Sequence, residues 1–119
     1  MGLNLKKNSK KDGEWYGCDL DGTLAYHDKW GGIEHIGKPI PKMLERVKKW
    51  ISEGKTVKIF TARAAEGPEA IKYVEDWLEE NGIGGLEVTN KKDFKLVELW
   101  DDRVVQVKKN TGERVDGKE

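Results

Sequence analysis

The sequence predicts an α/β protein in which a parallel β-sheet is flanked by helices. Short apolar segments, rich in β-branched and aromatic residues, alternate with two longer segments of helical periodicity. Their order along the chain is strand, helix, strand, helix, strand, strand, which is typical of parallel sheets. Polar or charged residues follow each of the first four predicted strands, where ligands bind in such sheets.

The first strand and the first helix are predicted in the amino-terminal half. Residues 14–19 form a short, aromatic-rich segment that ends in polar turn residues, as a buried strand does. The first helix opens at Pro39-Ile40-Pro41, because proline fits the first helical turn, and Gly54 ends it. Its apolar face recurs at helical spacing and comprises Ile40, Met43, Leu44, Val47, Trp50 and Ile51.

The second half repeats the alternation and then adds strands. Residues 55–60 alternate and are β-branched, which predicts the second strand. Pro68 opens the second helix and Asn81-Gly82 ends it, with an apolar face of Ile71, Val74, Trp77 and Leu78. The remaining strands are predicted at residues 86–88, 96–100 and 104–107, followed by a turn at 110–113.

Length and composition indicate one domain and exclude several classes of protein. The chain has 119 residues, within the range of roughly 100–200 residues for one domain. We expect a flexible, lysine-rich tail over residues 1–13, a core domain over 14–109, and a tail or short hairpin over 110–119. Lys and Arg number 22, as do Asp and Glu, so the chain lacks the basic excess of an electrostatic nucleic-acid binder.

The expected location is the cytoplasm. No apolar stretch approaches the ~20 residues that span a bilayer, so no membrane association is expected. The lysines near the amino terminus are not followed by the apolar segment of a secretory signal. Cys18 is the single cysteine, which excludes an intramolecular disulfide, and we expect it to be a small apolar residue of the core.

The residues after the strands predict a magnesium and phosphate site. Clustered carboxylates repel one another unless a cation lies among them, and an all-oxygen ligand set suits Mg²⁺. Protein-bound Mg²⁺ commonly contacts a substrate phosphate, whose oxygens hydroxyl and lysine groups would bind. The residues in question are Asp19, Asp21, Gly22 and Thr23, then Thr61, Ala62 and Arg63, then Asn90, Lys91 and Lys92, and finally Asp101 and Asp102.

These residues resemble the motifs of the haloacid dehalogenase superfamily of phosphohydrolases. The sequence Asp19-Leu20-Asp21-Gly22-Thr23-Leu24 is similar to its DxDGT signature. Thr61 resembles its second motif, Lys92 or Lys91 its third, and Asp101-Asp102 its fourth, in the same order. The resemblance covers residues 15–107 and implies a Rossmann-like core.

The resemblance also implies a role for each residue. Asp19 would be the nucleophile and a Mg²⁺ ligand, and Asp21 would be the general acid/base and give its backbone carbonyl to Mg²⁺. Thr61 would hydrogen-bond the phosphoryl group, and Lys92 would neutralise its charge. Asp101 and Asp102 would complete the metal site. Substrate-binding positions are Gly22, Thr23, Ala62, Arg63 and Lys91.

Some of these roles stay open at the level of sequence. Lys91 and Lys92 compete for the lysine role, and we favour Lys92 because Lys91 would point to the other side of an extended segment. Either Asp101 or Asp102 is the direct metal ligand. Arg63 either holds substrate or pairs with an acidic side chain. His27 and His35 are expected to be exposed loop residues rather than a zinc pair.

No cap domain is expected over the site. Residues 24–38 are too few for one, and residues 62–90 are taken up by elements that the core itself needs. The chain therefore resembles capless members of the superfamily, with Tyr26, Trp30 and Lys38 as a local rim. An open site has few contacts with which to select a small metabolite. We therefore expect better turnover of a larger substrate, such as a nucleotide, an oligonucleotide or a phosphoprotein.

The predicted function is that of a Mg²⁺-dependent phosphomonoester hydrolase that acts through an aspartyl-phosphate. One alternative is an enzyme that removes 3′-phosphates from nucleic-acid ends, suggested by the open site and the lysine-rich tail. Another is a non-catalytic domain that binds metal and phosphate. The oligomeric state does not follow from the sequence.

Overall fold

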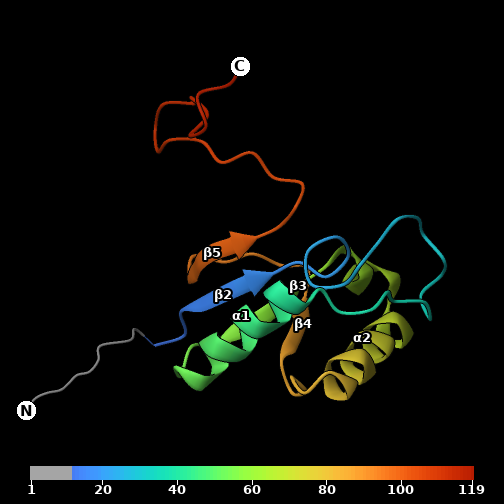
Figure 1. The fold of residues 1–119 in the computed structure, drawn as a ribbon. Coiled ribbons are helices and arrows are strands. Elements are labelled where there is room, and N and C mark those ends of the chain that lie inside the picture. Colours follow the sequence, from blue (N-terminus) through green and yellow to red (C-terminus); the bar gives the residue numbers. More distant parts are fainter. Residues whose placement is uncertain (1–11) are drawn as a thin grey trace, which may run out of the picture.

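A computed structural model describes residues 12–119, which form a four-stranded parallel sheet with helices. Figure 1 shows the elements in chain order. They are β2 (Trp15–Cys18), α1 (Pro41–Ser52), β3 (Val57–Phe60), the 3₁₀-helix η1 (Ala62–Glu66), α2 (Pro68–Glu80), β4 (Glu87–Thr89) and β5 (Leu96–Trp100). The predicted Rossmann-like α/β class is confirmed.

The sheet has the strand order β4-β3-β2-β5, with every neighbouring pair parallel. β2 lies at the centre, where Cys18 pairs with Ile59 on one side and Trp100 on the other. The carboxyl ends of β2, β3 and β5 therefore meet at one edge of the sheet. Ligands of open α/β proteins bind at this edge.

The two helices pack on one face of the sheet. The parallel crossovers from β2 to β3 and from β3 to β4 run in the same direction along the sheet, and the right-handed rule for such crossovers puts α1 and α2 on the same side. Pro41 and Pro68 occupy the first turns of the helices, as predicted. The apolar faces of both helices join the inward side chains of β2 and β3 in one core cluster, which includes Cys18, Val47, Ile59, Val74 and Leu78.

β4 and β5 are joined by a short connection that contains no helix. The segment 90–95 carries the chain from one edge strand of the sheet to the other. It is fixed to β2 by Trp15, whose main-chain N–H donates to the carbonyl of Lys95 (3.0 Å) and whose indole N–H donates to Asp93 (2.9 Å). These bonds set the position at which β5 begins to pair with β2.

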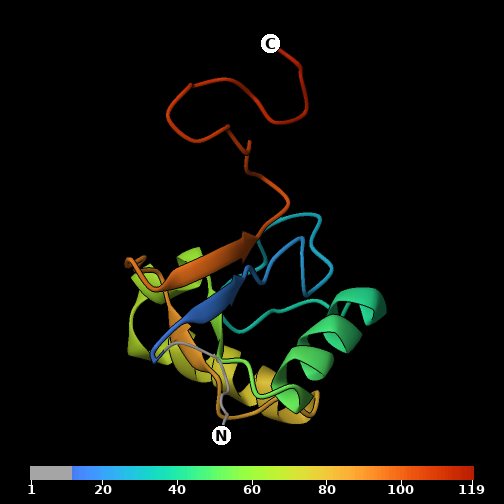
Figure 2. The ribbon, with the colours of Figure 1, turned by 90° about the vertical axis from the view of Figure 1, so that its left-hand side faces the viewer.

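The predicted strand at residues 104–107 is wrong. The residues after β5 extend away from the sheet in both views (Figures 1 and 2), and Val104, Val105 and Val107 are about half exposed. A single antiparallel bridge joins Val107 to Arg114 and closes a small hairpin-like turn. β-Branched residues do not form a strand without a neighbouring strand to pair with.

Other differences from the sequence expectations are small. Ile51, predicted on the buried face of α1, is 39% exposed, whereas Ala70 of α2 is buried. The helix η1 between β3 and α2 is not predicted by the sequence pattern. Most of the tail expected at residues 1–13 lies outside the described residues. Within residues 12–119, no helix is long and apolar enough to cross a membrane.

Candidate metal and phosphate site

A cleft of about 820 Å³ lies at the carboxyl edge of the sheet. Its lining includes eight residues that the sequence selected: Asp19, Asp21, Thr61, Ala62, Arg63, Asn90, Asp101 and Asp102. They come from the carboxyl ends of the four strands and from η1. Strand pairing therefore gathers in one place residues that lie far apart in the chain.

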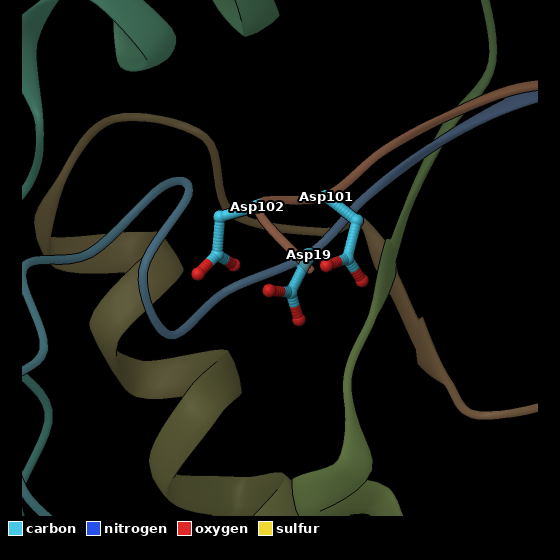
Figure 3. A group of neighbouring side chains, drawn as sticks. All are labelled: Asp19, Asp101 and Asp102. Carbon is cyan, nitrogen blue, oxygen red and sulfur yellow. The ribbon is translucent and has the colours of Figure 1, made fainter. Parts of the chain in front are cut away.

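Three carboxylates of the lining lie close together (Figure 3). Asp19 follows β2, and Asp101 and Asp102 follow β5, which is paired with β2. Each offers an oxygen, and the three oxygens lie within 4.8 Å of one another. A hard divalent cation accepts such an all-oxygen set, so the donor chemistry fits Mg²⁺.

Thr23 links Asp19, which follows β2, to Asp102, which follows β5. Its hydroxyl oxygen accepts a hydrogen bond from the main-chain N–H of Asp102 (3.0 Å), and its O–H faces the Asp102 carboxylate (3.1 Å). Asp19 Oδ2 lies 3.5 Å from the same hydroxyl. Asp101 accepts from the main-chain N–H of Arg103 (2.8 Å), which fixes the side chain of Asp101 over the turn. The carboxylates are therefore oriented before any ligand arrives.

The electrostatics of Asp19 favour a cation beside it. Burial, followed by the negative charge of Asp101, raises the pKa of the Asp19 carboxyl from 3.8 to about 7. The main-chain N–H of Leu20 opposes this rise in pKa. A cation bound among the three carboxylates would favour the ionised form of Asp19.

Gly22 makes the close approach of Asp102 possible. Its φ is +91°, and a Cβ at this position would lie 2.6 Å from Asp102 Oδ2. A side chain here would therefore push Asp102 out of the carboxylate cluster. In the structure Gly22 lies against the Asp102 carboxylate and Thr23 contacts it, and the substrate-binding role expected of both residues stays a prediction.

Asp21 and Arg63 form a two-bond ion pair. Arg63 Nε donates to Asp21 Oδ2 (2.8 Å) and Nη2 donates to Oδ1 (2.9 Å). Of the two possibilities left open for Arg63, the structure has the pairing with an acidic side chain. The Arg63 side chain is 3% exposed, while that of Asp21 is 21% exposed and lines the cleft. His27 Nδ1 lies 3.6 Å from Asp21 Oδ1.

Thr61 lies at the end of β3 and is 2% exposed. It caps η1, because its hydroxyl oxygen accepts from the main-chain N–H of Arg63 (3.1 Å). The hydroxyl proton is not used in that bond and remains available to a ligand in the cleft. Ala62, the next residue, contributes to the lining with its small side chain.

The two lysines that the sequence selected do not line the cleft. Lys91 and Lys92 are exposed, and neither lines the cleft, whereas their neighbour Asn90 does. The main-chain N–H of Lys91 donates to the Thr89 hydroxyl (3.0 Å), which fixes Lys91 at the end of β4. The choice between the two lysines therefore stays a prediction.

Sequence reasoning missed several residues of the lining, although it expected Trp30 at the rim, and Trp30 does line the cleft. Arg103 follows the acidic pair directly and places a cation in the cleft, and His27 reaches it from the 26–38 loop. Arg103 could have been found from its position at a strand end. His27 carried no such signal, because the folding of a loop does not follow from periodicity.

Cys18 is in the core, as predicted, and takes no part in the chemistry of the cleft. The side chain is fully buried, and this burial raises the pKa of the thiol to about 12. A thiol in this state supplies almost no thiolate near neutral pH. The polar groups that line the cleft are carboxylates, the Thr61 hydroxyl, two guanidinium groups, the His27 imidazole and the Asn90 amide.

Comparison with known proteins supports the fold. The solved structure of a conserved protein from Bacteroides thetaiotaomicron is similar to this chain, with a TM-score of 0.58. The two sequences are 24% identical, and the match covers 76% of each chain. No protein-family model matches the sequence, and no curated protein matches it either. The similarity is therefore one of α/β architecture.

Proposed function

We propose that this protein is a Mg²⁺-dependent phosphomonoester hydrolase that acts through an aspartyl-phosphate. The observation that carries the proposal is the cluster of Asp19, Asp101 and Asp102, whose oxygens lie within 4.8 Å of one another in a cleft shared with Asp21 and Thr61. The motif resemblance to the haloacid dehalogenase superfamily supports the same assignment.

The metal would be held by Asp19, Asp101 or Asp102, and the backbone carbonyl of Asp21. Bound there, Mg²⁺ would supply charge stabilisation to the phosphoryl oxygens and keep Asp19 ionised at neutral pH. The raised pKa of Asp19, about 7 without a metal, is consistent with a site that functions with a cation present. The donor set contains only oxygen, which suits Mg²⁺ better than zinc.

The chemical steps would use this chain's own side chains. An Asp19 carboxylate oxygen attacks phosphorus, the ester P–O bond breaks, and Asp21 gives a proton to the leaving oxygen. Water then attacks the aspartyl-phosphate, Asp21 takes its proton, and inorganic phosphate leaves while Asp19 is regenerated. The Thr61 hydroxyl donates to a phosphoryl oxygen throughout, and Arg103 contributes positive charge at the cleft wall.

A panel of phosphate esters, assayed with Mg²⁺ and with EDTA, tests the proposal. We expect Mg²⁺-dependent release of phosphate, no release in EDTA, and loss of turnover in a folded Asp19→Asn variant. Asp28→Asn is the matched control, since Asp28 is an exposed carboxylate in the 26–38 loop that does not line the cleft. A protein that binds Mg²⁺ and phosphate but hydrolyses no ester would instead be the non-catalytic domain.

A further inference from the structure

The most connected side chain of the cleft is Arg63, and its contacts extend beyond Asp21. Nη1 donates to the carbonyl of Ile33 (3.2 Å), and Nη2 also donates to the carbonyl of His35 (2.8 Å). The guanidinium lies 4.7 Å from the centre of the Trp30 ring. Arg63 therefore contacts the Asp21 carboxylate on one side and three residues of the 26–38 loop on the other.

The loop is otherwise held mainly at its base. Tyr26 N–H donates to the Lys38 carbonyl (2.8 Å), and Ala25 forms a bridge with Pro39. The Trp77 indole of α2 donates to the Gly37 carbonyl (2.9 Å). Residues 28–31 between these anchors are exposed. The contacts of Arg63 with Trp30, Ile33 and His35 thus hold the part of the loop that borders the cleft.

The same contacts fix the orientation of Asp21. A carboxylate oxygen has two lone pairs, and the guanidinium fork occupies one lone pair on each oxygen. This leaves the second lone pair of Oδ2 to carry the proton that Asp21 would transfer, whereas His27 Nδ1 lies 3.6 Å from Oδ1. The fork also prevents rotation of the carboxylate plane. Lysine cannot reproduce this geometry, because it carries a compact charge without a planar fork.

We propose that Arg63 is a positioning residue that couples the 26–38 loop to Asp21, so that the loop is ordered and the acid is oriented by one side chain. The inference rests on the proposed function, since it gives Asp21 the proton-transfer role. Its consequence is that, when a large leaving group contacts the loop at Trp30, the Asp21 carboxyl is already oriented to give it a proton. The loop would act on specificity through Arg63 rather than through a cap.

Arg63→Lys tests the coupling by two independent measurements. The first is the rate at which trypsin cuts after Lys29, the only tryptic site of the 26–38 loop because Lys38 precedes proline. We expect this rate to rise by about 10-fold, since local opening of the loop becomes easier. Arg46→Lys is the matched control, because Arg46 also lies 4.7 Å from a tryptophan ring, that of Trp100, outside the cleft.

The second measurement compares an alkyl phosphate with an aryl phosphate. Alkyl leaving groups need a proton and aryl ones do so much less, so Arg63→Lys should lower kcat at least about 10-fold on the alkyl ester and far less on the aryl ester. A merely structural role would lower both to the same extent. Trp30→Leu, at a 54% exposed position, should show the same two effects at smaller size and serves where Arg63→Lys does not fold.

The outcomes separate this inference from the proposed function. An active wild-type enzyme whose Arg63→Lys variant loses both substrates equally, or is cut no faster after Lys29, would overturn the positioning role alone. A wild-type protein without phosphatase activity would overturn the proposed function, whatever the trypsin result. Faster cleavage together with selective loss on the alkyl ester would support the coupling.

Discussion

Gly22 and Asp102 lie so close together that no side chain fits between them. A Cβ on Gly22 would come within 2.6 Å of Asp102 Oδ2 and 2.9 Å of its carboxyl carbon. The turn after β2 therefore touches the turn after β5, and the contact depends on the absence of a side chain. The contact brings Asp101 and Asp102, which follow β5, close to Asp19, which follows β2.

Gly22→Ala should weaken Mg²⁺ binding beyond the effect of backbone strain. The added Cβ displaces Asp102, so we expect Mg²⁺ affinity measured by calorimetry to fall about 10-fold or more. Gly85→Ala is the control, because Gly85 has a similar φ of +89° but nothing within 4 Å of its Cβ position. Both variants carry the cost of alanine at positive φ, and equal Mg²⁺ affinity in the two would contradict the proposed contact.

Asp19→Asn should stabilise the metal-free protein above neutral pH. The pKa of Asp19 is about 7 when the chain is folded, against 3.8 for an unperturbed aspartate, so the folded protein holds its proton more tightly. Ionisation therefore costs stability as pH rises from about 4, and this cost is complete above about 7. We expect the variant to gain about 4 °C in Tm at pH 8, and much less at pH 4.

The comparison with Asp101→Asn sharpens this thermal-melt test. Asp101 contributes to the raised pKa of Asp19, so its removal should recover part of the same gain. Melting curves in EDTA from pH 4 to pH 9 would check both variants. An Asp19→Asn variant less stable than the wild type at pH 8 would show that Asp19 is favourably paired rather than repelled.

Mg²⁺ affinity should increase with pH up to about 7. A metal ligand must be deprotonated, so protons compete with Mg²⁺ for Asp19 below its pKa of about 7. The apparent Kd should fall by about tenfold per pH unit below this value and level off above it. Calorimetric titrations at pH 5.5, 6.5, 7.5 and 8.5 would measure this trend, and an affinity independent of pH would argue against Asp19 as a ligand.

Asp21→Asn should discriminate between leaving groups. Loss of the proton donor should cost about 10²–10⁴-fold in kcat on an alkyl phosphate and much less on p-nitrophenyl phosphate. The amide also removes one acceptor oxygen from Arg63, a nearly buried cation, so the variant should be less stable than Asp28→Asn. Equal losses of kcat on both substrates would leave Asp21 with a structural role only.

Lys91→Ala should lower kcat more than Lys92→Ala. Lys91 directly follows Asn90, which lines the cleft, and its main-chain N–H is bound to Thr89 at the end of β4. Its side chain therefore starts from a fixed point near the site, and removal of the charge should leave the phosphoryl group less neutralised. Steady-state kinetics of the two variants would decide, and a larger loss at Lys92 would restore the choice made from the sequence.

The sequence was sufficient for the order of elements and for the carboxylates, because both depend on local pattern. Hydrophobic periodicity located α1 and α2, and polar residues after strands located Asp19, Thr61 and Asp101. It failed at residues 104–107, where strand formation depends on a neighbouring strand that is not there. Composition and residue spacing do not show which strands, far apart in the chain, pair with one another.

Arg63 illustrates the same limit within the site. The sequence left two roles open for Arg63, binding substrate or pairing with an acidic side chain. Only the folded positions of Asp21 and the 26–38 loop decide between these roles. The hydrogen bonds of Arg63 to the Ile33 and His35 carbonyls involve backbone atoms, which no side-chain motif encodes.

The pairing of β5 with β2 has a consequence for synthesis of the chain. β2 is the first strand of the sheet to leave the ribosome and β5 is the last, yet the carboxylates of the proposed metal site come from both. Until β5 emerges, β2 has one open hydrogen-bonding edge and Asp19 has neither of its acidic neighbours. Mg²⁺ binding would therefore be acquired only after β5 and the acidic pair that follows it have been synthesised, and a chain truncated before residue 96 would lack it.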